Sequence, residues 1–265
     1  MIKFFRNIRQ RLLTENKFSK YLIYAIGEIV LVVFGILIAL QINTWNDERK
    51  AQKVEDNFFY DVLLDLKKDN ANLNYYKKFH TKRITYLDTL LTYVRNPNKT
   101  MGIKKFGMYT EPLFYTVAPT SYETTFESAK SMGEFNNFKE KQLVKDLSQY
   151  YADFVQLENS FSSITRFVEN QFEPLMYKLP EGYMSEDTGM LVINEEDVQE
   201  FYNKVASIKD NRKITYDYEI ILKTPNTENY LIGDMGRSYT ALGKIITRQE
   251  VLTKLERALN KTIKR

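Results

Sequence analysis

The stretch of sequence that decides the fold runs from Tyr21 to Ile42 and reads YLIYAIGEIVLVVFGILIALQI. It carries one charged residue, Glu28, and its centre, Ile29–Leu40, is an unbroken run of twelve apolar or glycine residues. A helix of about 20 apolar residues crosses the ~30 Å hydrocarbon core of a bilayer. A buried helix of a soluble protein is the competing interpretation, but such helices seldom run this long without a polar face. The sequence therefore predicts a transmembrane helix over residues 21–42.

Aromatic residues flank this predicted span on both sides. Tyr21 and Tyr24 lie at its first end, and Trp45 follows its last residue. Amphipathic aromatic rings favour the boundary between lipid and water. We expect these three side chains to anchor the helix at the two interfaces.

The charge of the chain is concentrated at its N-terminus. The whole chain of 265 residues has a net charge of +4, and residues 1–20 alone hold six basic residues against one acidic residue. Residues 43–265 hold 32 basic and 32 acidic residues and are therefore neutral overall. A nucleic-acid-binding domain requires a basic face, so we expect no nucleic-acid partner.

The basic arm at residues 1–20 predicts the orientation of the span. Lys and Arg are enriched on the cytoplasmic side of membrane helices, which places the N-terminus in the cytoplasm and the C-terminal domain outside. A cleaved signal peptide is the rival interpretation, but the apolar region is long for one and QINTWN offers no small-residue cleavage site. Within the basic arm, apolar residues recur at helical spacing. This pattern suits a short helix that lies on an anionic inner leaflet. The basic side chains expected to contact those lipids are Lys3, Arg6, Arg9 and Arg11.

Two features inside the span bear on function. An ionisable residue in a membrane helix is costly and by default suggests a function, so Glu28 is the membrane-embedded acidic candidate. Either Glu28 is protonated or reaches toward the headgroups, or it belongs to a proton path or contacts a partner helix. Gly35 and Ala39 form a small-xxx-small pair that permits close helix packing.

Helical spacing dominates the remaining chain, residues 43–265. No Gly or Pro lies between Gly35 and Pro97, so the span is predicted to continue as one long helix to about Arg95. We predict a mostly α fold, with this helix followed by an extracytoplasmic antiparallel α-helical bundle. Loops are predicted near 96–119, with a short strand at 113–117, and near 177–194; residues 213–222 are compatible with helix or strand. Further helices are predicted from about 120, 139 to 176, 194 and 227 to 263.

Three signals place helix ends in this region. Thr120 with Glu123 has the spacing of a capping box, and Asn137 with Glu140 repeats that start signal. Gly133 fits a helix stop. The last helix, by contrast, is expected to be irregular around Gly233 and Gly236 because glycine weakens helices.

The N-terminal fifty residues resemble the start of a large, uncharacterised family of bacterial single-pass envelope proteins. The shared features are the basic arm, Gly27-Glu28-Ile29 at the start of the span and Gln41-Ile42-Asn43-Thr44-Trp45-Asn46 at its exit. Residues Ser121–Tyr151 are similar to a helix–Gly–turn–helix segment of that family. The resemblance implies a domain of unknown function anchored in the bacterial inner membrane and facing the periplasm, and it implies no catalytic residues.

Motifs for catalysis and cofactor binding are missing from the sequence. The chain has no Cys and a single His, His80, and it contains no P-loop, nucleophile elbow, zinc-protease or dinucleotide-binding motif. His80 is expected to be structural or merely exposed, and Asp234 is expected to lie in or near a loop. We therefore predict no catalytic residue, no metal ligand and no cofactor.

Three functions remain open on the sequence alone. The favoured one is a non-enzymatic interaction, scaffold or sensor subunit whose partner is an unknown protein or a second copy. The second is a subunit of an ion-driven membrane complex that uses Glu28. The third is a membrane-bound enzyme.

Overall fold

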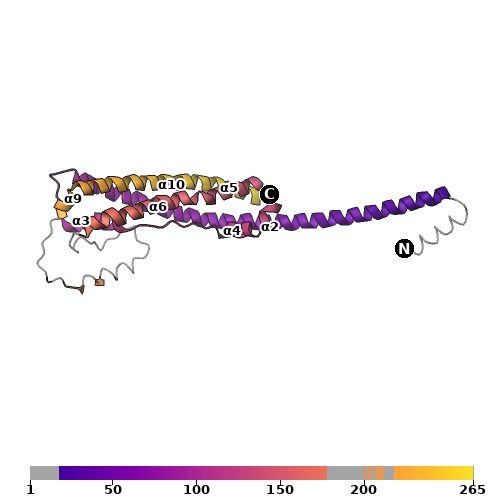
Figure 1. The fold of residues 1–265 in the computed structure, drawn as a ribbon, viewed down its shortest axis with the longest axis horizontal. Helices are drawn as coiled ribbons and strands as arrows, with labels where there is room; N and C mark the ends of the chain where they lie inside the picture. The colour runs from indigo at the N-terminus through magenta and orange to yellow at the C-terminus, as the bar shows by residue number, and fades with distance from the viewer. Residues whose placement is uncertain are drawn as a thin grey trace. The chain divides into compact units, whose positions relative to one another are not determined.

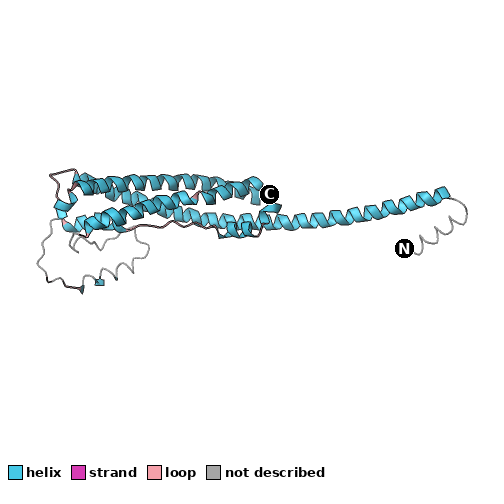
Figure 2. Ribbon diagram, in the orientation of Figure 1, coloured by secondary structure: helices cyan, strands magenta, loops and turns pink. Residues whose placement is uncertain are grey.

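The computed structural model describes residues 18–177 and 218–264, together with short pieces at 200, 203–204, 207–209 and 211. Every regular element within these residues is helical, and no strand occurs among them (Figure 2). The predicted mostly α-helical fold is confirmed for this part of the chain. In chain order the elements are α2 (Phe18–Val94), α3 (Ile103–Thr110), the 3-10 helix η1 (Glu111–Phe114), α4 (Thr124–Ser131), the 3-10 helix η2 (Glu134–Asn137), α5 (Lys141–Ala152), α6 (Phe154–Phe167), the π-helix η3 (Val168–Phe172), α7 (Glu173–Met176), α9 (Tyr218–Leu222) and α10 (Pro225–Ile263).

Helix α2 is a single element of 77 residues. The absence of Gly and Pro after Gly35 leaves nothing to break it, and it ends at Val94, three residues before Pro97. From Ala25 onward it is long and apolar enough to cross a membrane, and none of its most apolar window is buried in the described structure. The prediction that the apolar segment continues into a long helix is confirmed.

The chain divides into two compact units, residues 1–57 with 136–139 and residues 58–135 with 140–265. In the first unit, the buried carboxylate of Glu55 accepts hydrogen bonds from the backbone N–H of Lys139 at 2.9 and 3.0 Å, one to each oxygen. This contact ties the short segment 136–139 to α2, because a buried carboxylate needs such donors.

In the second unit, α10 runs opposite to α2. Arg83 near the end of α2 meets Asp234 near the start of α10, whereas Asp69 earlier in α2 meets Arg248 later in α10. Helix α10 also packs along α5 and α6 (Figure 1). These two contacts show that α2 and α10 are antiparallel.

The α5–α6 run, by contrast, is parallel to α2. Tyr150 of α5 donates a hydrogen bond to Asp69 of α2, and Phe161 of α6 packs against Tyr76, which lies further along α2. Residue numbers therefore increase in the same direction along α2 and along α5–α6. The segment before α4 makes this possible because it returns along α2, where Thr120 bonds to Tyr76. Helix α10 is therefore antiparallel to α2 and also to α5–α6, where Lys244 meets Gln156 and Arg248 meets Tyr150. The antiparallel prediction holds for these pairs and not for α2 with α5–α6.

Apolar residues at helical spacing fill the core of the second unit. They come from the stripes that the sequence predicted on α2, α5, α6 and α10, and also from α3, η1 and α7. The completely buried apolar side chains are Phe59, Val62, Leu66, Leu87, Phe106, Leu113, Leu147, Met176, Ala241, Ile245, Leu252 and Leu259.

Residues 96–119 contain two short helices where the sequence suggested a loop and a strand. Helix α3 and η1 form because Phe106 and Leu113 are buried in the core. Pro112 occupies the start of η1, where a missing N–H interrupts no hydrogen bond. The expected strand at 113–117 is absent because its first residues belong to η1.

The predicted helix starts at Thr120 and Asn137 were wrong. Helix α4 begins at Thr124, and the Thr120 hydroxyl accepts a hydrogen bond from Asn72 of α2 at 3.0 Å instead of capping a helix. Asn137 lies in η2, and α5 begins after Glu140 without a side-chain cap. Tertiary contacts thus override the local capping signals.

The two long predicted helices differ from the structure in opposite ways. The predicted helix 139–176 is divided at Asp153 and passes through the π-helix η3. The last helix is continuous from Pro225 to Ile263, without the expected irregularity. At Gly233 a side-chain Cβ would lie 2.7 Å from the Phe167 ring, so this glycine makes room for packing rather than breaking the helix.

Several predictions fall on residues outside the described part of the chain. These are residues 1–17 of the basic arm, the loop near 177–194 apart from Tyr177, the helix start at Asn194 and residues 213–217. Residues 18–20 of the predicted arm already belong to α2. Residues 218–222 belong to α9 and are helical.

Gly133 ends α4 in a left-handed backbone conformation, with φ of 71°, as the predicted stop signal requires. Any other L-residue there is strained. We predict that Gly133→Ala lowers the free energy of unfolding by about 1–2 kcal/mol, measured by urea unfolding of the detergent-solubilised full chain with circular dichroism.

Gly243 provides a matched control for that substitution. It lies inside α10 and a Cβ there would meet open space, so Gly243→Ala should raise stability by about 0.5–1 kcal/mol. Equal losses in the two variants would contradict the conformational explanation.

Candidate functional site

The predicted membrane residues lie on the N-terminal part of α2. Glu28 is half-buried, whereas Gly35 and Ala39 are exposed. A Cβ added at Gly35 would meet nothing within 4 Å, so this face is open to the close approach of another helix. Trp45 is 60% exposed, with the Arg49 guanidinium 6.0 Å from its ring centroid.

The remaining predicted site residues cannot be placed. Lys3, Arg6, Arg9 and Arg11 lie outside the described residues, as do the side chains of Tyr21 and Tyr24. Their roles as lipid contacts and interface anchors stay predictions.

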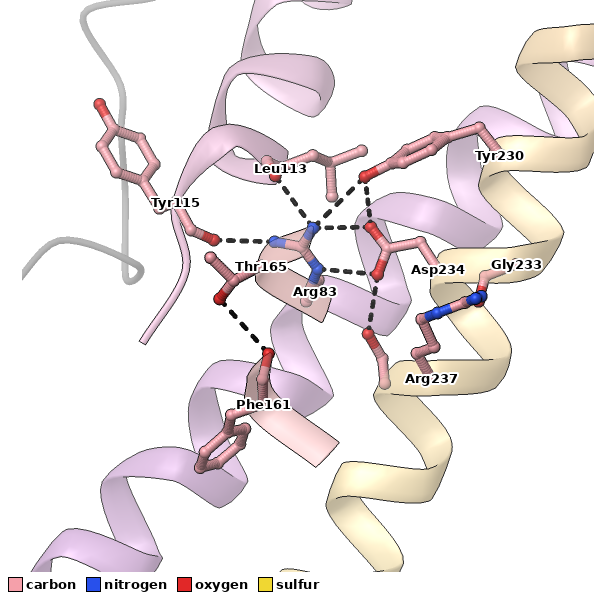
Figure 3. Close-up of polar contacts among 10 residues, drawn as sticks. Arg83, Leu113, Tyr115, Phe161, Thr165, Tyr230, Gly233, Asp234 and Arg237 are labelled. Atoms are coloured by element: carbon pink, nitrogen blue, oxygen red, sulfur yellow. Dashed lines mark hydrogen bonds and ion pairs between the residues drawn. The ribbon is translucent and has the colours of Figure 1, made fainter. Parts of the chain in front are cut away.

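The strongest polar feature of the second unit is a buried ion pair that the sequence did not reveal (Figure 3). Arg83 of α2 and Asp234 of α10 both have side chains with no exposed surface. Arg83 Nε donates to Asp234 Oδ1 at 3.1 Å, and its Nη2 donates to Oδ2 at 2.6 Å. Such a two-point contact fixes both distance and orientation.

Further hydrogen bonds complete this ion pair. Arg83 donates to the backbone carbonyls of Leu113 and Tyr115, each at 2.9 Å, where η1 ends and carbonyl groups lack helical partners (Figure 3). Asp234 accepts hydrogen bonds from the hydroxyls of Tyr230 at 2.6 Å and Ser238 at 3.2 Å. We call these six residues the Arg83 cluster.

Arg83 keeps its positive charge in the folded protein. Burial is the largest single influence and opposes the charged guanidinium, but the contacts with Asp234 and Tyr230 together outweigh it and hold the pKa of Arg83 above its ordinary value. Burial, followed by the negative charge of Asp234, raises the pKa of the Tyr230 hydroxyl well above its usual range. The hydroxyl therefore remains a hydrogen-bond donor rather than becoming a nucleophile.

A second polar cluster surrounds Asp69 of α2. Its carboxylate accepts hydrogen bonds from the Tyr122 backbone N–H at 2.8 Å and the Tyr150 hydroxyl at 3.0 Å. Arg248 of α10 lies 3.7 Å from the same carboxylate, stacks over the Tyr150 ring at 3.7 Å and donates to the Tyr150 carbonyl at 2.7 Å. Burial raises the pKa of Asp69 above its ordinary value, although the hydrogen bonds from Tyr122 and Tyr150 oppose this shift.

A shallow hollow of about 130 Å³ opens beside Arg248, between α10 and the junction of α5 and α6. Its polar lining includes Asp153, Gln156 and Lys244, and the Lys244 ammonium donates to Gln156 Oε1 at 2.9 Å. The described residues contain no group of three or more His, Asp or Glu side chains placed to hold a metal ion. The lining resembles a solvated helix junction rather than an acid–base pair.

His80 is structural, as one of the two sequence interpretations held. Its side chain is 1% exposed and stacks on the Phe161 ring at 4.8 Å. Asp234, expected near a loop, lies instead inside α10. Arg83 follows His80 at helical spacing on a buried stripe, and this charged residue at a core position was the available signal for the cluster.

One family model matches the chain over residues 28–156, and its description is "Family of unknown function (DUF6090)". The matched range begins at Glu28 and includes Asp69 and Arg83, whereas Asp234 and Arg248 lie beyond it. No curated protein and no solved structure matches the chain. The match supports a likeness to an uncharacterised domain family and brings no activity with it.

The Arg83 cluster predicts a large effect on stability. Arg83→Met leaves the Asp234 carboxylate buried without its cation, which should lower the free energy of unfolding by about 3–5 kcal/mol. Replacing both partners in Arg83→Met/Asp234→Leu should recover a large part of this loss, because no unpaired charge remains. Urea unfolding of the full chain in detergent measures all the variants.

The exposed ion pair between Arg95 and Glu228, at 2.7 Å, serves as the control. Arg95→Met should cost at most about 1 kcal/mol, because exposed pairs contribute little. Equal losses in Arg83→Met and Arg95→Met, or a double variant less stable than Arg83→Met, would contradict a structural role for the buried ion pair.

Proposed function

We propose that this chain is a single-pass protein of the bacterial inner membrane that serves as an interaction or scaffold subunit and is not an enzyme. The basic arm faces the cytoplasm, and the helical domain, an α-helical bundle, faces the periplasm. Its partners are the bilayer, with an anionic inner leaflet at the basic arm, and a protein that contacts the span or the helical domain.

The observation that carries the anchoring part is the uncovered apolar surface of α2. Between Leu22 and Ile42, fourteen large apolar side chains are each at least 46% exposed. Each such side chain gains about 1.5–3 kcal/mol when it leaves water, and a bilayer supplies that environment without any further folding of the chain. The bacterial and periplasmic assignments rest on the family resemblance and on the charge of the arm.

The interaction role is supported by how the buried ionisable residues are used. Arg83, Asp234, Asp69 and Arg248 each bond to groups from other elements of the fold, so their charges hold helices together. Exposed small residues at Gly35 and Ala39 leave room for a neighbouring helix within the membrane. Coupling to an ion gradient through Glu28 remains a prediction from sequence alone.

The absence of Cys from the chain permits a direct test of orientation. Single cysteines at Asn7→Cys and at the exposed Ala258→Cys can be labelled with a membrane-impermeant maleimide in spheroplasts. We predict labelling of Ala258→Cys in intact spheroplasts and labelling of Asn7→Cys only after permeabilisation. The reverse pattern would contradict the proposed orientation.

Crosslinking in native membranes followed by mass spectrometry tests the interaction role. We predict a reproducible protein partner or a second copy, recovered several-fold less with Gly35→Leu/Ala39→Leu because the added side chains block close helix packing. Leu37→Phe adds bulk on the opposite side of the same helix and should leave recovery unchanged. A chain that forms no reproducible crosslink would contradict the function, whereas full recovery with the double variant would contradict only the packing face.

A further inference from the structure

His80 occupies an unusual place for an ionisable side chain. It lies on α2 with 1% of its surface exposed, and its ring stacks on Phe161 of α6 at 4.8 Å and 11°. The Phe79 ring meets it edge-on at 5.3 Å. Neither Nδ1 nor Nε2 has a hydrogen-bond partner within the described residues. The imidazole therefore serves as an aromatic packing group at the contact between α2 and α6, which we call the α2–α6 seam.

The charges that reach this ring come from the Arg83 cluster. Arg83 is one turn further along α2 and repels a charged imidazolium, whereas Asp234 on α10 attracts it. Because Arg83 and Asp234 are bonded to each other at 2.6 Å, the attraction from Asp234 offsets part of the repulsion from Arg83. From α6 the facing side chain is Phe161, which does not titrate. No described group is placed to accept a hydrogen bond from a protonated His80.

We propose that His80 is an acid-sensitive latch, in which protonation of the imidazole opens the α2–α6 seam. An imidazolium has two N–H donors and a positive charge, and both require water or acceptors. The closed seam supplies neither, so the charged form is stable only when α2 and α6 separate enough to hydrate the ring.

The direction of the pH effect follows from the burial of His80. Burial, together with the repulsion from Arg83, lowers the pKa of His80 from 6.5 to about 3 in the closed state. In an open, hydrated seam the ordinary value near 6.5 applies. The open form therefore binds more protons, and the closed form is fully favoured above pH ~6.5 and weakens as the pH falls toward 3. Between pH 7.5 and pH 5 the opening equilibrium constant should rise about 30-fold.

His80 is well suited to this role because the chain has a single His and no Cys. Only His has an ordinary side-chain pKa between pH 5 and 8. The raised pKa of Asp69 acts in the opposite direction, since protonating Asp69 favours the folded state at low pH. A variant that changes only His80 separates the two effects.

The test is hydrogen exchange of the full chain in detergent or nanodiscs between pH 7.5 and 5, corrected for intrinsic exchange rates. In the wild type, the protection factors of α6 amides should fall about 30-fold. In His80→Phe, which keeps an apolar ring against Phe161, they should change less than about 2-fold. A third chain, His80→Phe/Lys78→His, carries its imidazole at an exposed position on the same helix and should behave like His80→Phe.

An equal fall in the protection factors of α6 amides at low pH in the wild type and in His80→Phe would overturn the proposed latch. The single imidazole also gives one set of NMR signals in the wild type, which keeps the proposal testable if a variant fails to fold. Titration of those signals near pH 6.5 while α6 stays protected would overturn the proposal. Loss of α6 protection together with imidazole protonation would support it.

Discussion

The second unit depends on one charged side chain that has no contact with water. Arg83 has no exposed surface, and a guanidinium keeps its charge at any pH that a protein tolerates. A buried guanidinium is stable only if nearly all of its N–H donors find hydrogen-bond acceptors. Asp234 supplies two acceptors and the end of η1 supplies two more. One residue thereby fixes the relative positions of α2, η1 and α10.

The two parts of α2 differ in where their apolar side chains point. In its first part α2 turns large apolar side chains outward, from Leu22 to Ile42. In its second part it turns apolar residues inward and adds buried polar groups, among them Asp69 and Arg83. The first pattern suits lipid and the second suits a protein core. This division is the physical basis for proposing an anchor joined to a folded domain.

Sequence periodicity located the core well, because helical stripes such as Leu66, Leu87 and Leu252 reflect burial directly. It failed where a residue serves a distant partner. The Thr120 hydroxyl bonds to α2, so a local capping signal was misleading. Arg83 at a core position of a helical stripe indicates a buried charge, but the sequence does not show that its partner is Asp234, because 151 positions separate the two residues. Of the proposed membrane site, the sequence indicated Glu28, Gly35 and Ala39, and their roles stay predictions.

Residue-resolved hydrogen exchange of the full chain at neutral pH shows whether the Arg83 cluster closes the folded unit. Within the second unit, the slowest amides should lie around Arg83 in α2 and Asp234 in α10 and should exchange only with global unfolding. Amides around these two residues that exchange as fast as those of the short helix α4 would contradict this role of the cluster.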